Sequence, residues 1–403
     1  MSHIIEQSKT LPVTDRFDVA VAGGGIAGIA AALSAARAGA KTVLIENQFM
    51  LGGLATAGLV TIYLPLCDGN GHQVSFGICE ELIRLSEKYG KDEPIPAAWN
   101  DPAATVEEKA EHRFRNRYHP NVFAIQCEQL LLATGVEILY GTRVAEVQLA
   151  QNKISHLILE NKSGRTAIEV GSVVDATGDS DVCAFAGAPT VPFAHGNNLP
   201  SWYYFIKEGK IGLKMLGFAD KVDENGNYVT PEGNPTVERY YTGLDGKENS
   251  EMVIASHKAL LEHFLENGDL SPTYSPVTIA TIPQLRMTRR IVGETEMDIA
   301  DEFKTVPTSV GMISNWKKRG PVYEVPFEAL YSKAVPNLLC AGRNISVSDA
   351  MWDVSRVIPC CAVTGEAAGL AAAMSEDMTT LSVTELQAKL MERKIPLHTN
   401  EVL

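Results

Sequence analysis

Three glycines near the amino end have the spacing that binds the pyrophosphate of a dinucleotide. In the stretch VAGGGIAG, Gly23, Gly25 and Gly28 form GxGxxG between an apolar run at 17–22, which predicts a strand, and an Ala-rich run at 26–38, which predicts a helix. The first glycine permits a tight turn, the second lets a pyrophosphate approach the backbone, and the third lets helix and strand pack closely. An ordinary tight turn would not need all these pieces in register, so we expect a dinucleotide site.

A carboxylate and a second glycine pair indicate which dinucleotide is bound. KTVLI at 41–45 predicts the next strand, and Glu46 ends it, where a carboxylate can accept hydrogen bonds from both ribose hydroxyls. The following LGGLATAGLV contains Gly52, Gly53 and Thr56. A nicotinamide domain would not normally need a second loop with exposed backbone directly after the ribose carboxylate, whereas the pyrophosphate and ribityl chain of FAD would. The sequence therefore favours FAD.

Two later segments support a flavin. VVDATGD at 173–179 predicts a strand that runs into an Ala-Thr-Gly turn, a weak signal alone but a well-known second contact in flavoproteins that bind two dinucleotides. SRVIPCCAVTGEAAG at 355–369 predicts a helix with Pro359 in its first turn, where the missing N–H costs nothing. The partial positive charge of a helix N-terminus suits the flavin N1–C2=O edge, where reduction places negative charge. A small-residue helix packed on a sheet would explain the Ala and Gly residues, but not the Arg-Val-Ile-Pro that precedes them.

With these segments the chain resembles the FAD-dependent oxidoreductase family whose FAD domain is of the glutathione-reductase type, distantly related to fumarate reductase flavoproteins and the GidA group. Matching stretches, among them LRMTRRIVGE and VPFEALYSKAVPNLLCAGRNIS, run from residue 18 to about residue 374. Relatives often carry a His after the AGRNIS stretch, where this chain has Asp349, so no proton-transfer role is carried over. The resemblance implies FAD as the cofactor, with these residues as contacts: Gly23, Gly25, Ile26, Ala27, Glu46, Asn47, Gly52, Gly53, Leu54, Ala55, Thr56, Val144, Ala176, Thr177, Gly178, Gly342, Arg343, Arg356 and Val357.

Candidates for the substrate side come from an arginine cluster and one histidine. Arg286, Arg289 and Arg290 could clamp a carboxylate or phosphate, or could equally pair with acidic residues between a cap and the FAD domain. On a helix or a strand, Arg286 and Arg290 are expected to share a face. His195 could act as an acid or base near the flavin, or could be a solvated loop residue.

Four residues around the start of the last predicted core helix are further candidates. Trp352 and Asp353 are expected to flank the flavin edge, and we count Asp353 with His195, Arg286 and Arg290 as possible catalytic residues. Cys360 and Cys361 would lie in the first helical turn, where a thiolate is favoured, although buried structural thiols are the commoner outcome. The seven cysteines are scattered without CxxC or CxxxxC spacing, so the sequence predicts neither a metal site nor a disulfide reductase.

The elements that must position these residues indicate an α/β fold. We expect a Rossmann-like FAD/NAD(P)-binding three-layer domain with an inserted α+β cap that binds substrate. The expected FAD-binding domain is discontinuous (12–60, 122–190 and 336–378), the cap comprises 61–121 and 191–335, and a helix and tail occupy 379–403. Further predicted elements are helices at 78–88, 106–117 and 382–393, strands at 144–149, 153–159, 166–170 and 173–176, and an exposed loop or hairpin at 222–250.

Charge and hydropathy limit the kinds of molecule that the protein is expected to bind. With Lys+Arg 35 against Asp+Glu 49, the net charge of −14 disfavours nucleic acid and anionic membrane surfaces. The basic clusters are short, at 113–117 and 286–290. No uncharged apolar run reaches the ~18–20 residues of a membrane span, and the amino terminus lacks the pattern of a signal peptide, so we expect a cytoplasmic protein with reduced thiols.

The expected function is that of an FAD-dependent oxidoreductase that transfers a hydride between a small polar or anionic substrate and the flavin. The chain contains no second GxGxxG that a strand-end carboxylate follows, so a dedicated NAD(P)H domain is not expected. Two alternatives are a GidA-like RNA-modifying flavoprotein and a flavin-binding subunit of a larger redox complex. No motif identifies the electron acceptor or the oligomeric state.

Overall fold

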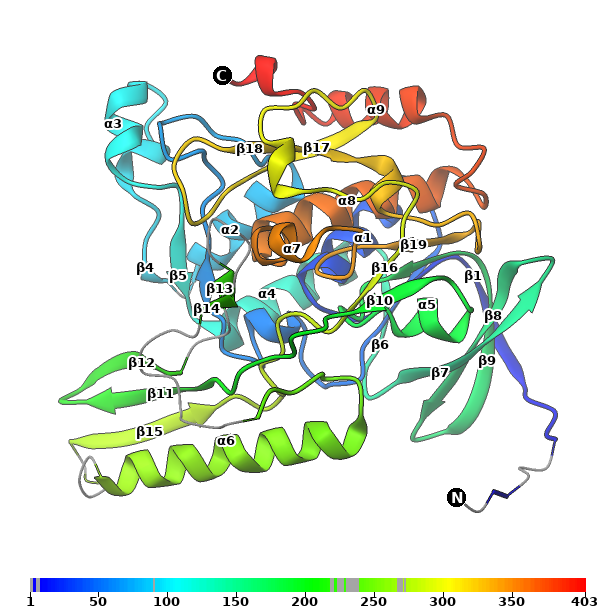
Figure 1. The fold of residues 1–403 in the computed structure, drawn as a ribbon, viewed down its shortest axis with the longest axis horizontal. Coiled ribbons are helices and arrows are strands. Elements are labelled where there is room, and N and C mark those ends of the chain that lie inside the picture. Colours follow the sequence, from blue (N-terminus) through cyan, green and yellow to red (C-terminus); the bar gives the residue numbers. More distant parts are fainter. Residues whose placement is uncertain are drawn as a thin grey trace.

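A parallel sheet forms the centre of the molecule. The computed structural model describes residues 3–4, 8–89, 91–217, 221–222, 228–229, 239–266, 271 and 273–403. In its central sheet, five mutually parallel strands lie in the order β6 (Glu137–Leu139), β2 (Thr42–Ile45), β1 (Val13–Ala22), β9 (Gly164–Asp175) and β19 (Leu338–Cys340). Antiparallel strands β8 (Lys153–Asn161) and β7 (Arg143–Ala150) extend the sheet from the first half of β9 (Figure 1).

Strand β9 changes its partner along its length. The sequence predicts two strands at 166–170 and 173–176, which is wrong, because the backbone stays extended through Gly171 and Ser172. β1 pairs with one side of β9 from Ala167 to Asp175, while the other side of β9 pairs first with β8 and then with β19. The antiparallel hairpin of β8 and β9 is thereby joined to the parallel sheet, and the buried end of β9 lies among the strands that face the site.

Two helices pack face to face through small residues. α1 (Ile26–Arg37) follows β1, and α8 (Ile358–Met374) follows β19 near the other end of the chain. A Cβ atom added at Gly365 would lie 2.3 Å from the carbonyl oxygen of Ala27, and one at Gly369 would lie 2.1 Å from that of Ala31. Backbone therefore touches backbone, and the Ala- and Gly-rich composition of both helices follows from that contact.

The segment at 191–335, which the sequence predicts as part of a cap, contains a helix that the sequence did not reveal. Strands β12 (Lys210–Leu216), β11 (Ser201–Lys207) and β15 (Tyr274–Ile279) form an antiparallel sheet, and α6 (Gly246–Glu266) runs along it (Figure 1). The prediction of a loop or hairpin at 222–250 is wrong from residue 246 onward, because Asp245 caps the helix by accepting a hydrogen bond from the Glu248 N–H. Residues 223–227 and 230–238 of that prediction lie outside the described residues.

The predicted helix at 106–117 is too long. α3 (Val106–Glu111) stops where His112 turns to an extended backbone, and β5 (Asn116–Tyr118) then pairs with β3 (Ile62–Tyr63) and β4 (Lys91–Glu93). The remaining helices are α2 (Ile78–Glu87), α4 (Pro120–Ala133), α5 (Asp181–Phe185), α7 (Asp349–Ser355) and α9 (Val383–Glu392), with 3-10 turns at Gly53–Ala55, Ala97–Trp99, Ile299–Asp301, Phe327–Ala329 and Thr399–Glu401. The remaining strand pairs are β10 (Thr190–Pro192) with β16 (Arg289–Ile291), β17 (Ser309–Ser314) with β18 (Val322–Pro326), and β13 (Lys221–Val222) with β14 (Tyr228–Val229).

Within the described ranges, no single helix has the length and apolar composition needed to cross a membrane. α7 and α8 meet that criterion only as a pair, with a bend of 91° between them. Most of α8 is buried against the core.

Candidate functional site

The carboxyl ends of β1, β2, β9 and β19 open into a cavity of about 780 Å³. All residues that the sequence predicts as cofactor contacts line this cavity, except Thr56. Segments from both ends of the chain therefore meet at one place, as expected at the carboxyl edge of an open parallel sheet. That each of these residues contacts FAD stays a prediction.

Thr56 has a different position from the one predicted. Its side chain is buried, and its hydroxyl donates a hydrogen bond to the carbonyl oxygen of Leu51. A Cβ added at Gly52, where φ is +100°, would collide with the Thr56 side chain. Thr56 thus shapes the second glycine loop from behind instead of facing the cavity.

The first glycine loop fits a pyrophosphate. Gly23 has φ of +101°, and a Cβ there would lie 2.5 Å from the Ala176 carbonyl oxygen, so only glycine is accommodated. A Cβ at Gly28 would lie 1.8 Å from the carbonyl oxygen of Gly23. At Gly25, by contrast, no atom lies within 4 Å of an added Cβ, because this position faces the cavity. The N-terminus of α1 follows directly, which gives an anion a bare backbone surface with a favourable dipole.

Glu46 supports this loop as well as lining the cavity. Its Oε2 accepts a hydrogen bond of 2.7 Å from the Gly24 N–H, and its Oε1 accepts one of 2.6 Å from the Gln48 N–H. Burial raises the pKa of this carboxyl above its ordinary value, although these backbone hydrogen bonds oppose the shift. Glu46 therefore has a role in holding the glycine loop that its place after the strand did not indicate.

We expect Glu46→Gln to weaken FAD binding about 10- to 100-fold, because the amide loses one charge-assisted acceptor, worth about 1.5–3 kcal/mol, toward the ribose or the loop. Fluorescence titration of the apoprotein with FAD measures this effect. Gln48→Ala is the matched control, since Gln48 also lines the cavity but only its backbone N–H bonds to Glu46. An unchanged affinity in folded Glu46→Gln would show that this carboxylate does not contact the adenosine.

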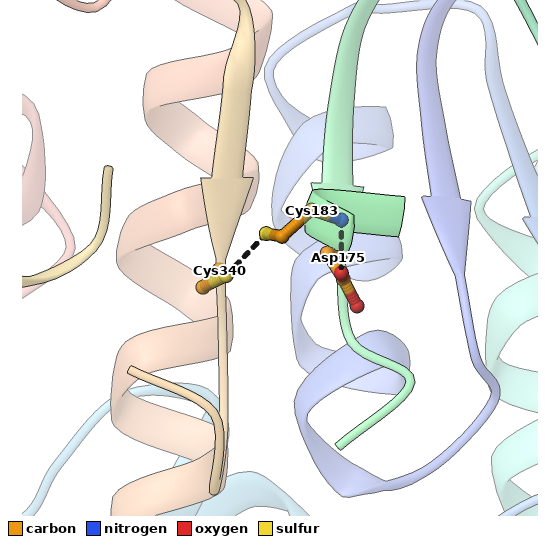
Figure 2. Close-up of side chains that lie close together, drawn as sticks. All are labelled: Asp175, Cys183 and Cys340. Atoms are coloured by element: carbon orange, nitrogen blue, oxygen red, sulfur yellow. Dashed lines mark hydrogen bonds between the residues drawn. The ribbon is translucent and has the colours of Figure 1, made fainter. Parts of the chain in front are cut away.

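Asp175 holds the turn that follows β9. Its Oδ1 accepts hydrogen bonds from the N–H (3.1 Å) and the hydroxyl (2.6 Å) of Thr177, and its Oδ2 accepts one of 3.0 Å from the Cys183 N–H. Figure 2 shows this carboxyl beside the thiols of Cys183 and Cys340, whose sulfur atoms lie 3.1 Å apart. The ligand atoms of all three residues lie within 4.8 Å of one another, a spacing that a metal ion could use. However, the carboxylate already accepts several hydrogen bonds and burial raises the pKa of both thiols, so the arrangement favours a structural role.

The two cysteines at the start of α8 behave as structural thiols. Cys360 is buried, and burial raises its pKa well above the ordinary value. Cys361 lines the cavity, and burial raises its pKa to about 12 although Arg343 and Arg356 favour the thiolate. The N-terminus of the helix does not make either thiol acidic, because burial is the largest influence on the pKa of both.

Carboxylates neutralise two arginines of the cavity. Arg343 pairs with Asp179 at 2.7 Å, and Arg356 pairs with Asp353. Asp353 is fully buried and also pairs with Lys317. Burial raises its pKa, but the charges of Arg356 and Lys317 outweigh burial and leave the pKa below the ordinary value. Asp353 does not line the cavity, so its placement suits positioning of Arg356 better than proton transfer.

Arg286 and Arg290 do not share a face. Arg286 lines the cavity, whereas Arg290 lies outside it, 3.0 Å from Glu296 and 4.0 Å from Asp349. The expected shared face is wrong because β16 begins only at Arg289, and Arg286 precedes it in irregular backbone. Arg289 bonds to the Asp179 carbonyl and to the Asp181 carboxylate at 2.8 Å, as the salt-bridge alternative proposed.

His195 and Trp352 lie apart from the cavity lining. The His195 ring contacts Phe193 and Tyr240, with ring centroids 6.2 Å and 4.7 Å away, and burial lowers its pKa. The Trp352 indole N–H donates a hydrogen bond to the carbonyl oxygen of Arg343. Neither side chain lines the cavity, so both fit the structural interpretation better than contact with a flavin edge.

The segment at 282–288 closes one side of the cavity, and sequence reasoning missed most of it. Asn197 anchors it, since its Oδ1 accepts hydrogen bonds from the N–H groups of Arg286 (2.8 Å) and Met287 (3.0 Å). Gln284 ties it to the second glycine loop through a 2.6 Å hydrogen bond to the Gly58 carbonyl. No spacing pattern marks Asn197 or Gln284, because their partners are backbone groups far away in the sequence. The lining residues contributed here are Ile282, Pro283, Leu285 and Arg286.

Comparisons with known proteins find one matching family and several similar solved structures. The family described as "FAD dependent oxidoreductase" matches residues 18–200 and 219–391. Three similar solved structures are a geranylgeranyl bacteriochlorophyll reductase-like protein from Thermoplasma acidophilum (15% identity, 95% of this chain and 85% of that chain, TM-score 0.47), p-nitrophenol 4-monooxygenase from Pseudomonas putida (12%, 94% and 81%, 0.45) and a myxobacterial chondrochloren halogenase (16%, 94% and 79%, 0.44). At these identities and TM-scores they indicate no substrate.

The family match covers most of the chain, including each segment that lines the cavity from Ala22 to Cys361. FAD is therefore the cofactor, and a bare glycine loop beside a strand-end carboxylate is a site that fits it. The chain belongs to the FAD-dependent oxidoreductase family and is a flavoenzyme that acts on a small molecule.

Proposed function

We propose that the enzyme transfers a hydride between FAD and a small anionic substrate, and that Arg286 binds the anion. The observation that supports this proposal is the charge of the cavity wall. Arg286 is 5% exposed and lines the cavity, yet no carboxylate in the described part of the chain lies within ion-pair distance of it. Arg343 and Arg356, which share the cavity, each have such a partner.

An unneutralised buried guanidinium is costly unless a ligand neutralises it. Burial, together with the like charges of Arg356 and Arg343, lowers the pKa of Arg286 to about 9. Its Nη1 donates one hydrogen bond of 3.3 Å to the Gln284 carbonyl, and the guanidinium lies over the Trp202 ring, 5.4 Å from the centroid. Because a guanidinium has five donors, several remain for a carboxylate or phosphate.

The residues at the start of α8 would hold the redox end of the cofactor. When bound, FAD accepts or donates the hydride. Val357 caps α8 without a side-chain hydrogen bond, so the free N–H groups of the first turn can stabilise negative charge on a nearby group. Arg356, fixed by Asp353, adds positive charge at the same place. The backbone at Gly342, with φ of +96°, passes close by, with room for glycine only.

We expect anaerobic titration of the purified holoprotein with a panel of carboxylates and phosphorylated metabolites to identify a compound that bleaches the flavin absorbance. The amide or ester of that compound should bleach it far more slowly, because it lacks the charge that Arg286 would bind. Equal rates for charged and neutral forms would contradict the proposed role of the anion. If no compound in the panel bleaches the flavin, a subunit whose flavin is reduced by a partner protein becomes the better interpretation.

A further inference from the structure

A second cavity, of about 540 Å³, adjoins the FAD site. Leu64 lines both cavities, and the second one is otherwise formed by residues around β5 and by the loop that joins β17 to β18. Arg113, Arg115 and Arg319 line it together with Trp316. These three arginines define what we call the arginine pocket, and two of them belong to the short basic cluster at 113–117.

The charges of the arginine pocket are not neutralised within the chain. Among the described residues, no carboxylate lies within ion-pair distance of Arg113, Arg115 or Arg319. Arg113 donates a 2.6 Å hydrogen bond to the Trp316 carbonyl, and Arg319 donates one of 3.0 Å to the Ala110 carbonyl, which leaves most of their donors available.

Two of the arginines are also crowded together. A Cβ added at Gly69 would lie 2.8 Å from Cγ of Arg319 and 3.2 Å from Nε of Arg113, so both side chains pack over the same turn. Burial lowers the pKa of Arg113, and the charges of Arg319 and Arg115 lower it as well. Like charges held this close are stabilised by a bound anion.

The nearby carboxylates have other partners or lie at the edge. Asp68 accepts hydrogen bonds from the N–H groups of Asn70 (2.7 Å) and His72 (3.1 Å) within its own turn. Glu93 lines the pocket but lies 3.2 Å from Arg117. Glu111 also lines it and is exposed, as are Arg115 and Arg319. The lining therefore has three arginines against two glutamates, in a chain whose net charge is −14.

The pocket wall also contains an unsatisfied acceptor. Asn116 is 2% exposed, and its Nδ2 donates a 2.9 Å hydrogen bond to the Ser86 hydroxyl. Its Oδ1 is buried and accepts no hydrogen bond from the described residues.

From this geometry we propose that the arginine pocket binds a small molecule through its carboxylate or phosphate group. Contacts connect the site with the FAD cavity: the Trp316 indole N–H donates a 2.9 Å hydrogen bond to the Asp353 carbonyl, and Asp353 pairs with Arg356 in the cavity wall. The proposal depends on these side chains and not on the hydride transfer proposed above.

The test is calorimetric titration of inorganic phosphate into the FAD-loaded protein. We expect saturable binding of phosphate to the wild type. Arg115→Gln and Arg319→Gln should each bind phosphate at least about tenfold more weakly, because each variant loses charge-assisted hydrogen bonds. Arg16→Gln is the matched control, since Arg16 does not line the pocket, its side chain is 68% exposed and it pairs with Glu169. No saturable binding, or equal binding to all variants, would overturn the proposal.

Two further measurements identify the cavity in which phosphate binds and show whether the bound anion is part of the substrate. If Arg286→Lys weakens phosphate binding and Arg115→Gln does not, the anion occupies the FAD cavity and the proposal is wrong. If the compound that bleaches the flavin shows a raised KM and an unchanged kcat in Arg115→Gln, the anion is part of the substrate. An unchanged KM, with phosphate binding lost, assigns the pocket to a separate small anion. Failure of every compound to bleach the flavin would leave the calorimetric result intact.

Discussion

Gly25→Ala is expected to fold and melt like the wild type and to bind FAD about 10- to 100-fold more weakly. The backbone at Gly25 has φ of −68° and ψ of −178°, which alanine adopts without strain. A methyl group there meets no protein atom within 4 Å, so the apoprotein loses nothing. It would instead enter the cavity where the pyrophosphate must approach the backbone, and overpacking of about 1–3 kcal/mol converts to that loss of affinity.

The neighbouring glycine of the same motif is the matched control. Gly28→Ala would place its Cβ 1.8 Å from the Gly23 carbonyl oxygen, between α1 and β1. We expect it to lower the free energy of unfolding by about 1–3 kcal/mol or more even without FAD. The measurements are thermal melting of both apoproteins and fluorescence titration with FAD. Wild-type affinity in Gly25→Ala would mean that the cofactor does not pass over this loop.

The parts of the site that could be predicted from sequence are those whose chemistry is local. The glycine loop, Glu46 and the start of α8 each lie within a few residues of the strand or helix that orients them. A glycine in such a motif indicates that its own position has no room for a side chain. In the structure, an added Cβ at Gly23 or Gly28 would collide with backbone atoms. The central βαβ unit followed from the same local signals.

What could not be predicted depends on contacts between distant segments. Arg286 and Arg290 are nearly adjacent in sequence, but one enters the cavity and the other pairs with Glu296. That difference follows from the start of β16 at Arg289 and from the hydrogen bond that the Arg286 N–H donates to the Asn197 side chain. Asn197 lies 89 residues away from Arg286 in the sequence. α6 was missed for a related reason: its first turn is polar and its cap, Asp245, lies in a segment with the composition of a loop.

This divergence of two neighbouring arginines allows a direct test of the proposed substrate contact. Arg286→Lys is expected to lower kcat/KM for the flavin-bleaching compound about 10- to 100-fold, because a point charge does not replace a planar fork that binds a carboxylate through two parallel hydrogen bonds. FAD content and the melting temperature should stay close to those of the wild type. Arg290→Lys, outside the cavity, should show the reverse: lower stability and nearly normal turnover of the molecules that retain FAD.

The pH dependence of the Arg286→Lys variant separates substrate binding from a general loss of structure. The burial and the like charges that lower the pKa of Arg286 to about 9 would also lower the pKa of a lysine at that position. Because a cation loses its charge as the pH rises through its pKa, kcat/KM of the variant should fall with rising pH at a lower pH than that of the wild type. Stopped-flow reduction of the flavin between about pH 6 and about pH 10 measures both profiles, because this range extends beyond the pKa of about 9 for Arg286. Parallel profiles, or a drop in stability for Arg286→Lys with normal turnover, would show that Arg286 supports the cap and does not bind the substrate.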